Sequence, residues 1–175
     1  MKLTALLLSL SLTSLSLSSA HAFSLNDVAK GADAITKGSS GSADLLSMGT
    51  DLFKSFKGND QAMSAAKGLM NAFSAEDYLG GFKYYDLIAK ADLTPSQLAT
   101  WNDVKNPLSA LVLERKFNFK DSGLSDLVSK ASSALQGNDT KSAGNYLSQL
   151  KDAATLTSGQ KNLLKEISAN LPLIK

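Results

Sequence analysis

Apolar residues recur at spacings of three and four along nearly the whole chain after residue 23, as they do on one face of a helix. Val and Ile together number only eight, and no segment alternates apolar and polar residues over the length of a strand. The sequence therefore predicts an all-α fold of seven or eight helices. The arrangement expected is an antiparallel helical bundle or a short stack of helical hairpins.

The expected helices begin and end at capping signals. The apolar residues spaced three and four apart predict helices around residues 24–37, 43–57, 60–73, 75–91, 95–117, 124–135, 139–150 and 160–171. Thr94-Pro95-Ser96-Gln97 is the strongest start signal, because Thr94 and Gln97 form a capping box and proline is tolerated in the first turn. Asp60 and Ser74 are expected to cap the helices that follow them. Asn106-Pro107 should kink or restart its helix.

The first 22 residues have the pattern of a secretory signal peptide. Lys2 precedes a Leu-rich stretch, and Ala20-His21-Ala22 places small residues at the cleavage-determining positions. The stretch is too short and too interrupted by serine for a stable membrane span. We expect an exported protein, periplasmic or extracellular, with no stable membrane anchor after cleavage. Residues 23–42 would then form an N-terminal helix and a Gly/Ser linker, followed by a helical domain over 43–175.

Two short motifs occur twice in the same order. Lys57-Gly58-Asn59-Asp60 and Gln136-Gly137-Asn138-Asp139 each join two amphipathic stretches, and Leu-Thr-x-x-Gln opens a later one at Leu93 and at Leu156. Shared helix-turn chemistry could produce such an echo, but the common order favours a duplicated helical unit. The units expected are residues 43–117 and 122–171.

Composition excludes several classes of catalytic and metal site. The chain has no cysteine, and His21, its only histidine, lies in the predicted signal peptide. The processed chain would therefore lack Ser-His-Asp and Cys-His catalysis, zinc and haem ligands, and disulfides. No cofactor and no metal are expected.

The charges are nearly balanced and interspersed. Lys and Arg number 18 against 16 Asp and Glu, and Arg115 is the only arginine. Because nucleic-acid binding needs a basic stripe, we expect no nucleic-acid partner. The same balance argues against a cationic membrane-active helix.

The remaining polar motifs have little specificity. Ser-x-x-Lys occurs at Ser64, Ser148 and Ser158, a frequency that indicates chance in a chain rich in both residues. Thirteen Asp and three Glu are largely explained by helix caps and exposed faces. Two apposed carboxylates could still support glycoside hydrolysis.

Aromatic residues gather around a pair of glycines. Two glycines inside a helix cost about 2 kcal/mol relative to alanine, so a close helix crossing, a kink or a bound ligand should offset the cost. The pattern favours an aromatic core layer that includes Phe82, with a tight crossing at the glycines. If a ligand or partner surface exists, its candidate residues are Tyr78, Gly80, Gly81, Tyr84, Tyr85 and Trp101.

These observations favour an exported, non-catalytic helical protein that binds a protein or peptide partner of unknown identity. No catalytic residue is assigned. Two other classes stay open: a hydrolase that uses an Asp/Glu pair, and a helical protein that perturbs membranes. Two acids in one aromatic-lined cleft would favour the first, and leakage of liposomes would favour the second.

Overall fold

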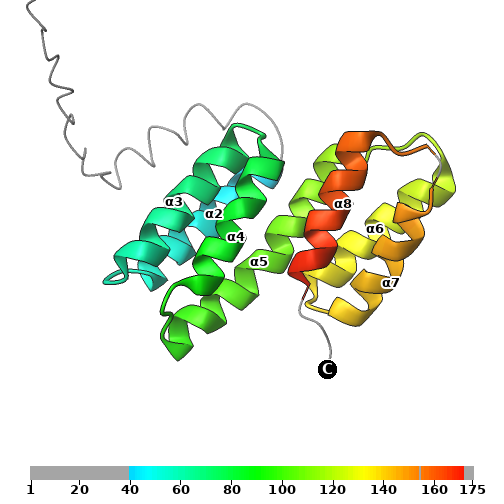
Figure 1. The fold of residues 1–175 in the computed structure, drawn as a ribbon. Coiled ribbons are helices and arrows are strands. Elements are labelled where there is room, and N and C mark those ends of the chain that lie inside the picture. The colour runs from blue at the N-terminus through cyan, green and yellow to red at the C-terminus, as the bar shows by residue number, and fades with distance from the viewer. Residues whose placement is uncertain (1–39, 154, 172–175) are drawn as a thin grey trace, which may run out of the picture. The chain divides into compact units, whose positions relative to one another are not determined.

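The computed structural model describes residues 40–153 and 155–171, and within these ranges it contains seven α-helices and no strand (Figure 1). The all-α prediction is confirmed for this part of the chain, which is consistent with a helical bundle. The predicted signal peptide and the helix expected at 24–37 lie outside the described residues. The helices are α2 (Ser40–Ser55), α3 (Asp60–Ser74), α4 (Tyr78–Lys90), α5 (Pro95–Lys116), α6 (Ser122–Gln136), α7 (Thr140–Lys151) and α8 (Ser158–Asn170).

Polar side chains cap the starts of six helices. Thr94 and Thr157 each form a complete capping box with the glutamine three residues later, as the sequence predicts. Each cap supplies an acceptor to a backbone N–H that has no partner inside the helix. Four further caps accept from the N–H three residues on: Asn59, Asp77, Asp121 and Asp139.

Two predicted caps are displaced. Asn59, not Asp60, caps α3, and Asp60 is the first residue of the helix. Ser74 does not cap α4, because it is the last residue of α3 and Asp77 is the cap. Asn59 and Asp60 are adjacent, whereas Ser74 and Asp77 are separated by two residues; in each case the backbone conformation of the turn decides which residue caps.

The expected restart at Pro107 is wrong, because α5 continues from Pro95 to Lys116 as one helix, and the kink stays a prediction. A proline inside a helix deprives the carbonyl four residues earlier of its donor. Here that carbonyl belongs to Asp103, an exposed residue, so water can replace the missing donor.

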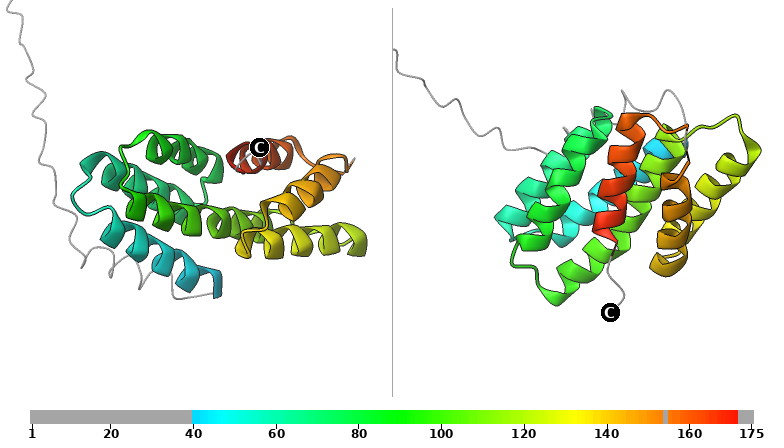
Figure 2. Two further views of the ribbon diagram at one scale, coloured as in Figure 1. Left: turned by 90° about the horizontal axis from the view of Figure 1, so that it is seen from below. Right: turned by 45° about the vertical axis from the view of Figure 1, so that its right-hand side comes forward.

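Helix α5 is the central helix of the described residues. Its second half buries six consecutive residues, 108–113, which requires neighbours on every side of the helix. Helices α2 and α6 pack against it, and α4 and α8 contact each other. Figure 2 (left) shows α5 running between α2 on one side and α4 and α8 on the other. None of the described helices combines the length and the apolar character needed to cross a bilayer.

The turn between α3 and α4 has the same hydrogen bonds as the turn between α6 and α7. Asp77 N donates to Ala72 O and Asp139 N donates to Ala134 O, both at 2.8 Å. The residue before each of these caps has a positive φ, 58° at Glu76 and 55° at Asn138. By contrast, in the Gly58-Asn59-Asp60 turn the positive φ falls on the glycine.

The two capping boxes also have a common second role. Gln97 Nε2 donates to Ser55 O at the end of α2 over 3.1 Å, and Gln160 Nε2 donates to Lys116 O at the end of α5 over 2.9 Å. Each box therefore fixes the start of its helix against the end of another. The matching turns and capping boxes therefore relate α3, α4 and α5 to α6, α7 and α8, in that order.

Candidate functional site

The predicted aromatic surface lies mostly in the core. Tyr78, Tyr85 and Trp101 are only 2%, 2% and 3% exposed. Edge-to-face contacts join Phe73 to Tyr78, Phe82 to Tyr85, and Tyr85 to Trp101, with ring centroids 4.9–5.3 Å apart. Such pairs contribute about 0.5–1.5 kcal/mol each beyond the area they bury. The structure thus contains the aromatic core layer that the sequence favours.

The polar ends of the two buried tyrosines have partners. Tyr85 Oη donates to Lys105 O over 3.0 Å, and Arg115 Nη1 donates to Tyr78 Oη over 3.3 Å. Burial raises the pKa of Tyr85 well above its ordinary value, so the hydroxyl stays protonated and acts as a donor. Both hydroxyls are thus engaged within the protein.

The glycines of α4 are explained by close contacts within the protein. A Cβ on Gly81 would lie 2.3 Å from Phe73 Cε1, where α3 and α4 cross. A Cβ on Gly80 would lie 2.0 Å from the capping carboxylate of Asp77. Tyr84 is half-buried, with its ring beside Gly68 of α3. A ligand or partner surface at these six residues stays a prediction.

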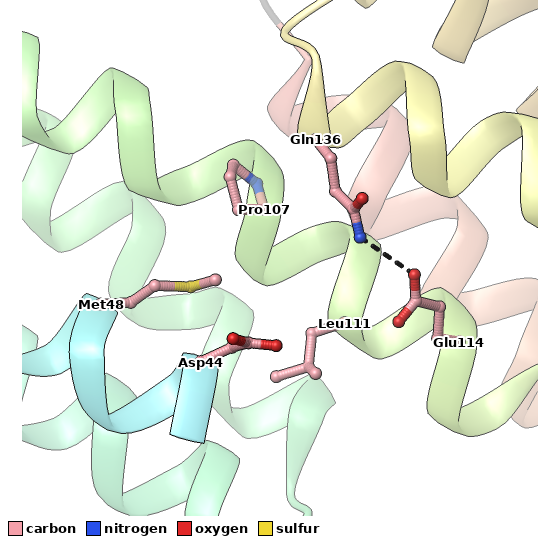
Figure 3. Close-up of a pocket in the computed structure, with 6 residues that line it drawn as sticks. All are labelled: Asp44, Met48, Pro107, Leu111, Glu114 and Gln136. Carbon is pink, nitrogen blue, oxygen red and sulfur yellow. Dashed lines mark hydrogen bonds between the residues drawn. The ribbon is translucent and has the colours of Figure 1, made fainter. Parts of the chain in front are cut away.

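A pocket of about 270 Å³ lies elsewhere, where α2 and α6 both approach α5. Met48, Pro107 and Leu111 form its apolar wall, and two carboxylates and an amide supply its polar groups (Figure 3). We call it the α2–α6 groove. Its lining residues are Asp44 and Met48 from α2, Pro107, Leu111 and Glu114 from α5, and Gln136 from α6.

The carboxylate of Glu114 is held in place from α6. Its Oε1 accepts a hydrogen bond from the hydroxyl of Ser132 and a second from Gln136 Nε2, the latter over 3.0 Å. Ser132 is itself buried, so its hydroxyl is fixed by the packing of α6. On the other side of Leu111, the Asp44 side chain reaches from α2 toward the same space (Figure 3). The groove therefore has acceptors on both of its sides.

None of the six groove residues was predicted as a site residue. In the sequence, Pro107 indicates only an interruption of its helix, and Glu114 is one of three glutamates in the chain. The one sequence signal for this site is that an acidic residue, Glu114, directly follows the run of apolar residues that ends at Leu113. That signal becomes meaningful only once α2 and α6 are placed against α5.

Within the described residues, no three acidic or histidine side chains come together as a metal site requires. Comparison of the chain with models of protein families, with curated proteins and with solved structures gives no significant match. The function must therefore be argued from the groove and its chemistry.

Proposed function

We propose that this is an exported, non-catalytic helical protein that binds a protein or peptide partner in the α2–α6 groove. The observation that supports this proposal is one pocket with an apolar wall and polar acceptors on opposite sides. Binding sites commonly combine a mainly apolar surface with a few fixed polar groups that orient the ligand. Glu114, held by two donors, is such a group.

The proposal includes the architecture expected from the sequence. Residues 1–22 would be removed as a signal peptide, and the remaining helices would form a stack of antiparallel hairpins. The recurring turns and capping boxes support a duplicated unit of α3–α5 and α6–α8, since the same hydrogen bonds occur in both. This pairing matches the α3–α4 turn, and not the expected Gly58 turn, with the Gly137 turn. Stacked hairpins commonly present grooves to peptides and partner helices.

A charge reversal in the groove tests the proposal. The purified wild-type protein, the Asp44→Lys variant and the Asp86→Lys variant are used to capture partners from the exported fraction of the host. Both aspartates are exposed, and Asp86 lies on α4 outside the groove, so the two variants change the net charge equally. We expect a near-stoichiometric partner with wild type and Asp86→Lys, and its loss with Asp44→Lys.

Two outcomes of this experiment would contradict the proposal. Recovery of no partner by wild type would contradict a binding function. Equal recovery by wild type and Asp44→Lys would place the binding site outside the groove. Circular dichroism of the three proteins serves as the folding control.

One observation supports the hydrolase hypothesis: Asp44 and Glu114 line the same pocket. It expects the substitutions Asp44→Asn and Glu114→Gln each to abolish hydrolysis of a glycoside substrate. The groove is lined by Met48, Pro107 and Leu111 instead of the aromatic side chains that this hypothesis anticipates. The membrane hypothesis stays a proposal to be tested by leakage of liposomes.

A further inference from the structure

We infer that the α2–α6 groove recognises a segment of a partner protein through one basic side chain that lies beside an apolar residue. This inference rests on the proposed function and specifies the chemistry of the partner. Its three supports are the charge of the groove, the fixed position of one carboxylate, and the size and apolar character of the wall.

The charge of the groove is negative. Two of its six lining residues, Asp44 and Glu114, are acids, and none of the six is basic. A cation that enters the groove therefore meets acceptors from α2 and from α5 without a competing lysine or arginine in the wall. An interaction of this kind between partly exposed charges weakens with salt, because the screening length is about 8 Å at physiological ionic strength.

Glu114 is positioned before any ligand arrives. Its Oε1 is engaged by Ser132 and Gln136, which restricts the rotation of the side chain. An acceptor that is already ordered loses less conformational entropy when it binds. Arginine would match such a carboxylate best, since its planar guanidinium can donate two parallel hydrogen bonds.

The size and the wall of the groove fit a side chain better than a whole small molecule. Its volume of about 270 Å³ lies just below the range of roughly 300–1,000 Å³ for small-molecule sites. Arginine and lysine have an aliphatic stem that can cover Leu111 while the charged end reaches the carboxylates. Met48 adds a flexible surface that can adapt to a neighbouring apolar residue.

The mouth of the groove favours a peptide over a free amine. Asp44, Glu114 and Gln136 are exposed residues on three helices. A chain that enters between them can therefore continue over α2 and α6 in either direction. A free amine would use only the charged end of the site and would leave the apolar wall without a partner.

A random peptide display library, selected on the purified full-length protein, tests the inference. We expect enriched peptides with arginine or lysine next to an apolar residue. The affinity of one such synthetic peptide is then measured by calorimetry with wild type, Asp44→Asn, Glu114→Gln and the control Asp86→Asn. Each groove substitution should weaken binding by about fivefold, the upper end for one partly exposed ion pair. The control should bind like wild type.

Glu114→Gln keeps an acceptor oxygen for Ser132 and Gln136, so it removes the charge and spares the hydrogen bonds. Replacement of the peptide's arginine by citrulline should weaken binding to wild type and leave the affinity for the double variant Asp44→Asn/Glu114→Gln almost unchanged. Added sodium chloride should weaken only the wild-type complex with the arginine peptide.

Three results would overturn the inference. The first is enrichment of peptides without a basic residue, and the second is unchanged affinity in both groove variants. The third is equal binding of free arginine amide and the peptide. Each leaves the proposed binding function standing if Asp44→Lys still loses the captured partner. Failure of that capture experiment, by contrast, would count against the proposed function itself.

Discussion

Gly81 and Gly144 occupy similar backbone positions but different surroundings. Both lie inside helices, at the fourth residue of α4 and the fifth of α7. A Cβ on Gly81 would meet the fully buried ring of Phe73 at 2.3 Å, whereas one on Gly144 would lie 3.9 Å from Leu171 Cδ1. Helix propensity favours alanine at both sites. The neighbours decide whether that preference can be realised.

The residue-scale prediction is that Gly81→Ala destabilises the protein and Gly144→Ala stabilises it. Overpacking against Phe73 should lower the free energy of unfolding by about 1–3 kcal/mol. Alanine at Gly144 should raise the free energy of unfolding by about 0.5–1 kcal/mol. Urea denaturation followed by circular dichroism measures both. A stabilising effect of Gly81→Ala would show that α3 and α4 do not cross closely there.

At the scale of single residues, the sequence could predict a close contact at the two glycines but not which residues make it. A glycine pair beside several aromatic residues indicates a close approach. The ring that approaches Gly81 comes from Phe73 of α3, and Gly80 is confined by the cap Asp77. These distances depend on the turn at Ala75–Asp77, whose conformation was not predicted.

At the scale of helices and turns, the capping residues determine most of the boundaries. The sequence predicts the starts at Thr94 and Thr157 because threonine and glutamine at this spacing have one dominant local solution. It misplaces the caps near Asp60 and Ser74, where a second polar residue within three positions takes the capping role. Of the two outcomes predicted at Pro107, the restart is wrong, because burial of α5 over 108–113 stabilises a helix that local propensity would interrupt.

The cap of α7 predicts a pH dependence. Asp139 accepts from Ser142, and this hydrogen bonding lowers the pKa of the carboxyl below its ordinary value. The folded state therefore binds the proton less readily than the unfolded chain. The resulting stability is present above the unfolded-state pKa of about 3.9 and is lost as the pH falls through the lower folded-state pKa.

We therefore expect Asp139→Asn to be less stable than wild type at neutral pH, with the difference shrinking below about pH 4. Asparagine can still cap a helix, so the difference reports the charge and not the loss of an acceptor. Urea denaturation over a pH series measures it, with Asp86→Asn inside α4 as the control for removing an exposed charge. A difference that is independent of pH would contradict the role of the ionised cap.

At the scale of the whole described region, the groove arises from packing that no local pattern encodes. Asp44 and Gln136 are far apart in sequence and reach the same pocket because α2 and α6 both contact α5. The apolar periodicity predicts that each helix has a buried face. It does not predict which helices share α5, and so it could not assemble the two carboxylates into one site.

The central position of α5 predicts that the described helices unfold together. Trp101, the only tryptophan, contacts Tyr85 of α4, and Leu147 of α7 is fully buried in the same hydrophobic core. Leu147→Ala should cost about 2–5 kcal/mol and should lower the urea midpoint of Trp101 fluorescence as much as that of circular dichroism. Leu87→Ala, at a residue 45% exposed on α4, should change neither appreciably. If Leu147→Ala moved the circular dichroism midpoint alone, α5 would not transmit stability between the two groups of helices, and the groove could open without unfolding the aromatic layer.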